Sequence, residues 1–267
     1  MALGVLVALV TVTGVLHATG AGVSLGIATS MQVHVGAALL SIPLALWHVW
    51  ARRIRPRRTD LSRRNLLRAG ALAGGGAVVY FAVEGVVRLA RLPGGRRRFT
   101  GSHERGSGRP QDMPITQWLD DSVQSIDPSS WRLALRRTDG AVREWTLDEL
   151  EGREDRHKIR ATLDCTGGWF AEQEWEGVTL ERLLGDVGWA SSIVVRSQTG
   201  YARRFPARDA PHLLLATRVA GGALDAGHGA PARLVAPGRR GFWWVKWVVS
   251  VEASSTPWWW QPPFPLT

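Results

Sequence analysis

Cysteine is nearly absent from this chain. Cys165 is the only cysteine among 267 residues, so no intramolecular disulfide can form. This excludes a fold stapled by disulfides, the usual solution for small secreted domains. A lone cysteine is most often a small buried hydrophobe, and the alternative is a reactive or metal-ligating thiol. The stretch TLDCTGGWFAEQEW, rich in Gly and Trp, holds this cysteine and makes the choice between the two the first question.

Charge is missing from the start of the chain. Residues 1–51 contain no Asp, Glu, Lys or Arg. Two apolar segments there, residues 2–19 and 33–50, each have about the 20 residues that a membrane-spanning helix needs. A third apolar segment, residues 69–90, is rich in glycine and carries two charged residues near its end. We therefore predict a membrane region over residues 1–92 with three spans.

The basic residues are concentrated in one window. Residues 51–68 contain eight arginines and one acid, Asp60, and so supply +7 of the net charge of +10. Arginines beside an apolar segment are the positive-inside signal and lie near anionic lipid headgroups. A protein that binds nucleic acid would spread such residues over a folded face, so we expect none as a partner. We predict a multi-pass protein of the cell membrane, with residues 51–68 in the cytoplasm and the soluble domain on the extracytoplasmic side.

An export signal stands at the start of the third span. In LSRRNLLRAGALAGGGA, Arg63 and Arg64 follow Ser62 and precede a weakly apolar stretch rich in Gly and Ala. This order is typical of a twin-arginine signal, whose route carries proteins already folded. The alternative is an ordinary basic anchor. No small-residue cleavage site follows, so we predict that the segment remains as an anchor.

Three histidines lie in the apolar segments. His34 and His48 are 14 residues apart, which on a helix places them on one face and about 21 Å apart. His17, late in the first span, falls at the level of His34, so this pair could hold the iron of a haem b. The alternative is a set of interfacial histidines, with Trp47 and Trp50 marking the headgroup zone.

The rest of the chain interleaves short strands and short helices. Residues 131–137 and 141–145 flank Asp139-Gly140 and predict a β-hairpin, and residues 157–164 alternate as a strand that ends before Cys165. The order follows no regular strand–helix alternation, so we predict an α+β fold of mixed sheets rather than a doubly wound sheet. The further predicted elements are a capping box at Thr146 and Glu149, a helix over 179–188, and strands over 192–197, 212–219, 232–237 and 242–252.

Tryptophan is abundant, with 14 residues. In GFWWVKWVV, a strand period of two places Phe242, Trp244 and Lys246 on one face, and Trp243 and Val245 on the other. Both faces are bulky, which predicts a central strand in which Lys246 needs an anionic partner. The WWW run near the C-terminus suits either an interfacial belt or a lid over a site, although core packing is the commoner fate of such residues.

Several motifs together resemble a known family. LDCTGGWF, EWEGVTLERLLG, GYARRFP and HGAPARLVAPG followed by VKW are similar to the molybdenum-cofactor domain of the sulfite oxidase family, over roughly residues 99–267. The nearest shape is the single-domain bacterial type, such as the periplasmic enzymes that reduce methionine sulfoxide. The resemblance implies an oxidoreductase with Mo-molybdopterin as cofactor. It also implies an electron-transfer partner, either a cytochrome or a quinone-linked membrane protein.

The resemblance implies roles for individual residues. Cys165 stands where the family places its molybdenum ligand, and a thiolate is a soft donor suited to such a metal. Arg233 and Lys246 match positions that bind the phosphate end of the pterin, with surface ion pairing as the alternative. His228 matches a position that contacts the pterin. The further matches are Trp244 and Val245, whose backbone would meet the cofactor, Ser197, and Ser102, His103 and Glu104 in an early cofactor loop within the linker, residues 93–110.

Two departures from the family bear on the substrate. CTGGWF is uncharged, and the closing WWWQPPFPL has no Arg or Tyr, so the family's clamp for sulfite is missing. We therefore expect oxygen-atom transfer, with molybdenum cycling between Mo(VI) and Mo(IV), on a neutral substrate such as a sulfoxide or N-oxide. Sulfite stays an alternative substrate, because four arginines could line the entrance to the site. They are Arg203, Arg204, Arg239 and Arg240. The remaining alternatives are a haem-bearing electron-transfer subunit and a cofactor-free, membrane-tethered binding module.

Overall fold

The computed structural model describes residues 2–20, 24–25, 28–52, 62–118, 121–137 and 139–263. The chain divides into two compact units, Met1–His103 and Glu104–Thr267. Half of the predicted cytoplasmic loop, residues 53–61, lies outside the described residues, as do the last four residues. The boundary between the units falls within the linker predicted over residues 93–110.

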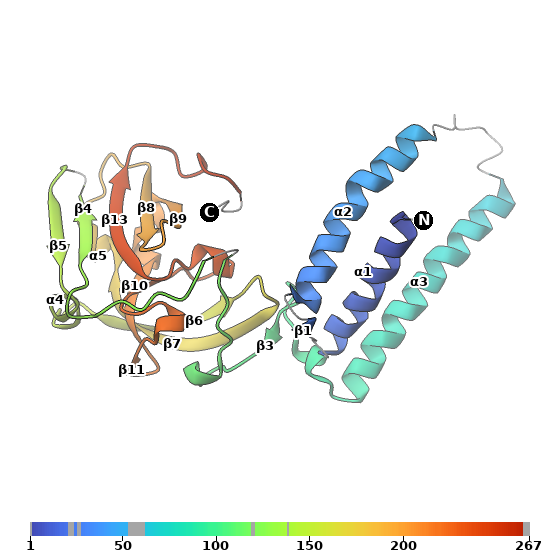
Figure 1. Ribbon diagram of the computed structural model, residues 1–267, viewed down its shortest axis with the longest axis horizontal. Helices are drawn as coiled ribbons and strands as arrows, with labels where there is room; N and C mark the ends of the chain where they lie inside the picture. Colours follow the sequence, from blue (N-terminus) through green and yellow to red (C-terminus); the bar gives the residue numbers. More distant parts are fainter. Residues whose placement is uncertain are drawn as a thin grey trace. The chain divides into compact units, whose positions relative to one another are not determined.

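Three long helices make up the first unit (Figure 1). They are α1 (Ala2–Thr19), α2 (Ser30–Ala51) and α3 (Arg63–Leu89), and α1 packs against both others. Each is long and apolar enough to cross a membrane, as the sequence predicted. The third helix begins earlier than expected because Ser62 caps it, its hydroxyl accepting a hydrogen bond from the Asn65 amide. The twin arginines therefore form the first turn of α3. A short pair, β1 (Ser24–Leu25) and β2 (Ala28–Thr29), lies between α1 and α2 in the chain.

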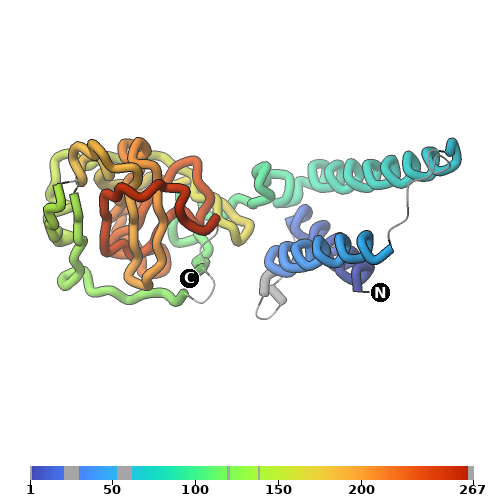
Figure 2. The backbone as a smooth tube through the Cα atoms, turned by 90° about the horizontal axis from the view of Figure 1, so that it is seen from above, coloured from blue at the N-terminus to red at the C-terminus, as the bar shows by residue number. Residues whose placement is uncertain are grey.

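Two sheets form the second unit (Figures 1 and 2). The first runs β11–β10–β7–β3, with β12 paired to β10 and β6 paired to β7. Its strands are β3 (His103–Glu104), β6 (His157–Asp164), β7 (Trp169–Thr179), β10 (Leu214–Val219), β11 (Gly222–Ala223) and β12 (Arg233–Val235). The second runs β5–β4–β13–β8–β9. Its strands are β4 (Leu133–Arg136), β5 (Val142–Trp145), β8 (Ser192–Ser197), β9 (Ala202–Pro206) and β13 (Val248–Ser254).

Short helices and 3-10 turns connect these strands. They are α4 (Leu147–Glu151), α5 (Leu180–Leu184), η3 (Pro110–Asp112), η4 (Ala207–His212), η5 (Ala226–His228) and η6 (Gly241–Trp243). In the second sheet, β13 and β4 are parallel. The other three strand pairs of this sheet are antiparallel. The predicted α+β class of mixed sheets and short helices is confirmed. One hydrophobic cluster draws buried side chains from both sheets, including Trp175, Leu133 and Phe205.

Several local predictions are confirmed. β4 and β5 form the expected hairpin, and β6 ends directly before Cys165. The capping box opens α4, with Thr146 Oγ1 accepting from the Glu149 amide at 3.1 Å and Glu149 Oε2 accepting from the Thr146 amide at 2.7 Å. The predicted helix over 179–188 is shorter, because Gly185 takes a φ of 72° and stops α5 after Leu184.

The predicted strand over 242–252 is wrong in its first half. Residues Gly241–Trp243 form the turn η6, and β13 begins only at Val248. Trp244 and Val245 are both buried, at 3% and 1% exposure, yet neither belongs to a strand. The Val245 carbonyl accepts from the Leu234 amide of β12 at 2.7 Å. Tertiary contacts around a pocket therefore override the local alternation.

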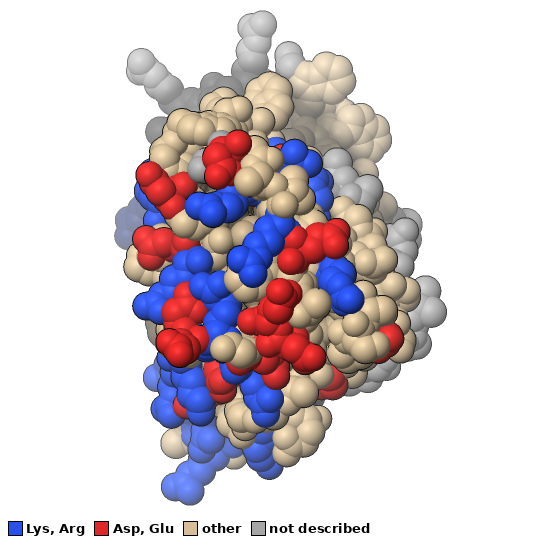
Figure 3. Space-filling view, turned by 90° about the vertical axis from the view of Figure 1, so that its left-hand side faces the viewer, with Lys and Arg blue, Asp and Glu red and all other residues tan. Residues whose placement is uncertain are grey.

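Charged side chains of both signs are interleaved on the face shown in Figure 3. Across β6 and β7, Lys158 pairs with Glu174 at 3.0 Å and Arg156 pairs with Glu176 at 2.7 Å. Opposite charges on facing strands stabilise the pairing modestly. This arrangement leaves that face without a field of one sign.

Candidate functional site

Cys165 lies in the tight turn between β6 and β7. Its amide donates to the Trp169 carbonyl at 2.8 Å and closes the turn. The thiol accepts from the Gly167 amide at 3.3 Å. Only 8% of the residue is exposed, so the strand delivers a thiol to a nearly closed position at the end of the sheet.

The segment that leads into η6 packs behind this cysteine. Arg240 donates through Nη1 to Asp164 Oδ1 at 2.8 Å and through Nη2 to the Cys165 carbonyl at 3.1 Å. A Cβ on Gly241 would stand 3.0 Å from Cys165 Cα, closer than neighbouring carbons normally approach. These contacts hold the Cys165 backbone in place.

The thiol lines a pocket with an empty volume of about 480 Å³, its opening to solvent included. Aromatic rings make up much of its wall, and the ring centroids of Trp118 and Phe242 are 5.9 Å apart. The lining residues are Thr116, Gln117, Trp118, Asp121, Cys165, Thr166, Ser197, Tyr201, Gly241, Phe242, Trp244, Val245, Lys246 and Trp247. Seven of these fourteen residues carry a hydroxyl, an amide or a charge, and they lie beside large aromatic surfaces. Such a mixture suits a cofactor or ligand that has both polar and apolar parts.

Lys246 brings a positive charge to this pocket without a negative partner among the described residues. Its Nζ donates to the Gly227 carbonyl at 2.6 Å, to the Thr116 carbonyl at 2.9 Å and toward Gln117 Oε1 at 3.5 Å. Burial, together with the charge of Arg233, lowers the pKa of Lys246 to about 7. The anionic partner predicted for Lys246 is therefore missing from its contacts within the protein.

Arg233 is buried beside the pocket. Its guanidinium lies 5.0 Å from the ring centroid of Trp175 and 5.6 Å from that of Trp244. Nη1 donates to the His228 carbonyl at 3.0 Å, while Nε has no partner among the described residues. Burial lowers the pKa of Arg233 to about 10, which leaves it protonated at neutral pH. Surface ion pairing, the alternative for Arg233 and Lys246, does not describe either residue.

His228 is held by Asp225 at the end of η5. Its Nδ1 donates to Asp225 Oδ2 at 2.6 Å, and its Nε2 is buried with no partner among the described residues. Burial lowers the pKa of His228, and the hydrogen bond and charge of Asp225 act in the opposite direction. The ring is thus fixed in orientation, with one nitrogen available to a group that the protein does not supply.

The structure brings most of the predicted site residues together. Those that line the pocket are Cys165, Ser197, Trp244, Val245 and Lys246. Arg233 and His228 lie next to it, since Arg233 Nη2 donates to the Trp244 carbonyl at 3.4 Å and Lys246 bonds Gly227. Ser197 Oγ accepts from the Thr199 amide at 3.3 Å, and the Thr199 hydroxyl donates to Asp121 at 3.3 Å.

The early cofactor loop is not among the pocket's lining residues. Ser102 is fully buried, His103 Nε2 donates to the His17 carbonyl at 2.7 Å, and Glu104 Oε1 accepts from the Ser107 amide at 2.8 Å. The polar residues that enter the pocket from this part of the chain are Thr116, Gln117 and Asp121. No periodic pattern marks them in the sequence, so sequence reasoning missed them.

The histidines of the helices have other contacts. His17 Nε2 donates to the Gly101 carbonyl at 2.6 Å. His34 Nδ1 donates to the Val10 carbonyl at 3.0 Å, and its ring packs on α1 beside Gly14. His48 is exposed. No contact among the described residues supports a haem site.

The four arginines that were candidates to bind sulfite are not among the residues that line the pocket. Arg203 is buried under Trp243, with its guanidinium 4.1 Å from the ring centroid. Arg204 donates to the hydroxyls of Ser192 and Ser254. The remaining two pair with acids, Arg239 with Asp209 at 2.7 Å and Arg240 with Asp164 at 2.8 Å.

The residues around the pocket fit an anionic cofactor held by a thiolate. Three buried polar atoms have no partner among the described residues, namely His228 Nε2, Arg233 Nε and Gln117 Nε2. Buried polar groups of native proteins are normally hydrogen-bonded, so such a cluster indicates a bound group. Lys246 adds an ammonium with only neutral oxygen partners, and Cys165 adds a soft sulfur donor at the pocket wall.

Comparison with known proteins agrees with this chemistry. Residues 120–260, more than half of the chain, match the family model described as "Oxidoreductase molybdopterin binding domain". Sulfite oxidase of Gallus gallus is 27% identical, with 52% of this chain and 38% of that protein covered. The crystal structure of the sulfane dehydrogenase SoxCD from Paracoccus pantotrophus is similar at 25% identity and a TM-score of 0.47, with 50% of this chain and 40% of that chain covered. The matches thus span well under half the length of either relative. The chain belongs to the oxidoreductase molybdopterin-binding domain family.

Proposed function

We propose that this protein is a membrane-anchored molybdopterin oxidoreductase that transfers an oxygen atom between its metal and a neutral substrate, such as a sulfoxide or N-oxide. The observation that carries the proposal is the composition of one pocket. A thiol, an ammonium with no negative partner among the described residues and several aromatic rings line it, and no arginine does.

Cys165 is the residue that would ligate the metal. Burial raises the pKa of its thiol, and hydrogen bonds from Gly167 and Thr116 and the charges of Lys246 and Arg240 act in the opposite direction. Metal binding deprotonates a coordinating thiol. Arg240 and Gly241 fix the backbone on which the sulfur is carried.

Lys246 and Arg233 would hold the negatively charged end of the cofactor. Arg233 can add a hydrogen bond through Nε and Lys246 can add a compact charge, both without the need to break an ion pair inside the protein. His228 Nε2 would bond the pterin ring system, because Asp225 already fixes the other ring nitrogen. Beside the negatively charged end of the cofactor, the pKa of Lys246 would rise toward its ordinary value, because a nearby negative charge favours the ammonium.

When bound, Mo-molybdopterin supplies two-electron chemistry between Mo(VI) and Mo(IV), coupled to oxygen-atom transfer. In the reductive direction, a sulfoxide, two electrons and two protons give a sulfide and water. The protein's contribution is a pocket whose aromatic walls exclude water and orient the substrate. The electrons require a separate carrier, which we propose to be a cytochrome or a quinone-linked membrane protein.

The absence of an arginine from the described pocket lining favours a neutral substrate. Lys246 is the one cation among those residues, and Asp121 is the one carboxylate. A small dianion such as sulfite needs several fixed donors, and a site built without them discriminates against it. The pocket has one ammonium for sulfite, that of Lys246, and this group would already pair with the negatively charged cofactor.

Sulfite oxidation is the second candidate, because the curated relative from Gallus gallus is a sulfite oxidase. The two candidates separate in an assay of the molybdenum-loaded full chain. An aryl methyl sulfoxide with a reduced viologen dye tests reduction, and sulfite with ferricyanide tests oxidation. We expect turnover of the sulfoxide, none of sulfite, and loss of all turnover in Cys165→Ser. Turnover of sulfite alone would contradict the substrate proposal while keeping the cofactor proposal.

We also propose a placement in the membrane. Three apolar helices and the arginine-rich window support a multi-pass anchor, with the catalytic unit on the extracytoplasmic side and Arg63-Arg64 as its export signal. A haem-bearing subunit would show b-type bands in a reduced-minus-oxidised spectrum, and we expect none from this chain alone. A cofactor-free binding module would release no pterin on oxidation, whereas we expect pterin.

A further inference from the structure

A second group of arginines lies at the other end of α3. Between residues 85 and 103 the chain has five arginines and no acidic residue. They are Arg88, Arg91, Arg96, Arg97 and Arg98. Both ends of α3 are therefore basic, although the positive-inside rule explains only one of them.

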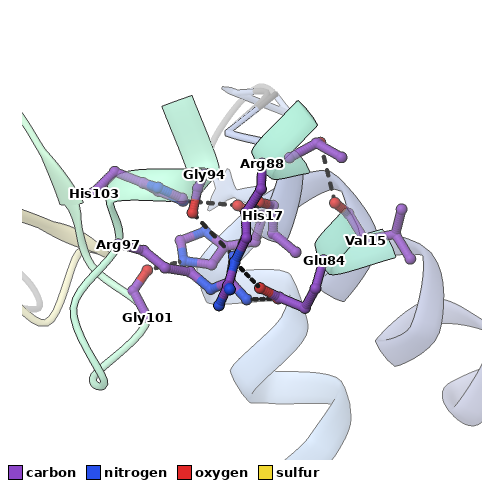
Figure 4. A network of polar contacts seen from close by, with 10 residues as sticks. Val15, His17, Glu84, Arg88, Gly94, Arg97, Gly101 and His103 are labelled. Carbon is purple, nitrogen blue, oxygen red and sulfur yellow. Dashed lines mark hydrogen bonds and ion pairs between the residues drawn. The ribbon is translucent and has the colours of Figure 1, made fainter. Parts of the chain in front are cut away.

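One of these arginines is used inside the unit (Figure 4). Arg97 forms an ion pair with Glu84 of α3, and both side chains are largely covered, at 22% and 16% exposure. It also donates to the Gly94 carbonyl at 3.0 Å and to the Ala18 carbonyl at the end of α1 at 3.5 Å. A cation at a helix C-terminus is favourable. Arg97 thus pins the turn after α3, η2 (Pro93–Arg96), against the end of α1.

Three others are exposed at this end of α3 and in the turn after it. Arg88 is 77% exposed in its side chain and only approaches Glu84, at 4.0 Å. Arg91 and Arg96 are exposed and form no ion pair within the described residues. The two carboxylates nearest in sequence have other partners, since Glu84 pairs with Arg97 and Glu104 accepts from the Ser107 amide. The outer side of this turn therefore carries uncompensated positive charge.

Large apolar side chains are neighbours of these arginines in the sequence. Phe99 is 95% exposed and Leu89 is 88% exposed, the two highest values for large hydrophobic side chains among the described residues. Exposed aromatic and aliphatic side chains next to arginines, at the end of an apolar helix, are the arrangement of an interfacial anchor. Exposure of both Phe99 and Leu89 to water alone would be unfavourable.

We infer that the outer face of this turn is a binding site for anionic phospholipid headgroups. Phe99 and Leu89 lie at the acyl boundary, and Arg88, Arg91 and Arg96 bind the phosphates, for which the planar guanidinium is well suited. The inference rests on the proposed insertion of the helices in a membrane. It is independent of the cofactor and the substrate.

The test uses the full chain purified in detergent, with native mass spectrometry as readout. The protein is titrated with phosphatidylglycerol or phosphatidylcholine, and the bound lipids are counted. We expect preferential retention of phosphatidylglycerol. The double variant Arg91→Gln/Arg96→Gln should bind it about 25-fold more weakly, because each arginine near a membrane surface contributes about a five-fold gain. A matched control, Arg196→Gln/Arg208→Gln, removes two exposed arginines from the second unit and should bind as the wild type does.

Two further measurements separate apolar contact from charge and binding from folding. Phe99→Ser should weaken retention of both lipids, since it removes apolar contact rather than charge, and thermal unfolding of all variants should match the wild type in detergent without added lipid. Equal retention of the two lipids by the wild type would overturn the inference. So would an equal loss in the double variant and in the control.

Discussion

The Lys246 ammonium contacts only neutral oxygen atoms in the pocket. Its protonation should therefore affect the stability of the fold measurably. Its pKa is lowered to about 7 in the folded chain, whereas an unfolded lysine titrates at about 10.4. Between these values the unfolded chain binds more protons. The free energy of unfolding of the cofactor-free protein should therefore rise as the pH rises from about 7 toward about 10.

Lys246→Met should remove this contribution. Urea unfolding of wild type and variant, each produced without cofactor, would be followed by Trp fluorescence at pH 7, 8 and 9. We expect the free energy of unfolding of the wild type to rise with pH relative to that of Lys246→Met. A constant difference over that range would show that the ammonium is not buried as described.

Gly241 should be intolerant of a side chain. Its Cβ would approach Cys165 Cα to 3.0 Å, so Gly241→Ala must displace the turn that carries Cys165. We expect a loss of about 1–3 kcal/mol in stability, typical of overpacking, and reduced molybdenum content. Gly222→Ala is the matched control, because its Cβ would meet its nearest neighbour at 3.7 Å. Equal molybdenum content in the two variants would argue against the role given to Gly241.

At the level of elements, the sequence predicted those whose pattern is local. The hairpin of β4 and β5, the capping box of α4 and the strand β6 each follow from alternation, turn residues or caps. Because β6 was predicted to end at Asp164, the placement of Cys165 at a strand end followed too. The three long apolar helices were predicted for the same reason, since length and apolar composition suffice.

Elements that depend on distant contacts were not predicted. Residues Gly241–Trp243 turn instead of extending, because Arg240 bonds Asp164 and the Cys165 carbonyl, 75 residues away in sequence. Thr116 enters the pocket because its hydroxyl accepts from Trp169 Nε1 at 2.9 Å, across 53 residues. No local pattern reports such pairings. The family resemblance indicated much of the pocket all the same, because it carries long-range information.

The first turn of α3 should act as an export signal. Ser62 caps the helix, and Arg63 and Arg64 follow it and are exposed. Arg63→Lys/Arg64→Lys keeps the charge and the cap but removes the arginine pair. We expect the second unit to remain in the cytoplasm, protected from protease added to spheroplasts, while Arg68→Lys leaves export unchanged. Normal protease sensitivity in the double variant would favour an ordinary basic anchor.

On the scale of the whole molecule, charge and chemistry are divided between the two units. The first unit carries 13 arginines against Asp60 and Glu84, so the entire positive net charge lies there and the second unit is close to neutral. The family match, residues 120–260, falls wholly within the second unit. The basic pI of about 11.2 therefore reflects the membrane region and not the site.

The central claim is that Cys165 binds the molybdenum of a molybdopterin cofactor. The most direct measurement is the molybdenum and pterin content of the purified full chain, by elemental analysis and by fluorescence after oxidative release, in wild type and Cys165→Ser. We predict one molybdenum and one pterin per wild-type chain, and molybdenum lost from the variant while its circular dichroism is unchanged. A wild type without either component, or a variant with undiminished molybdenum, would contradict the account.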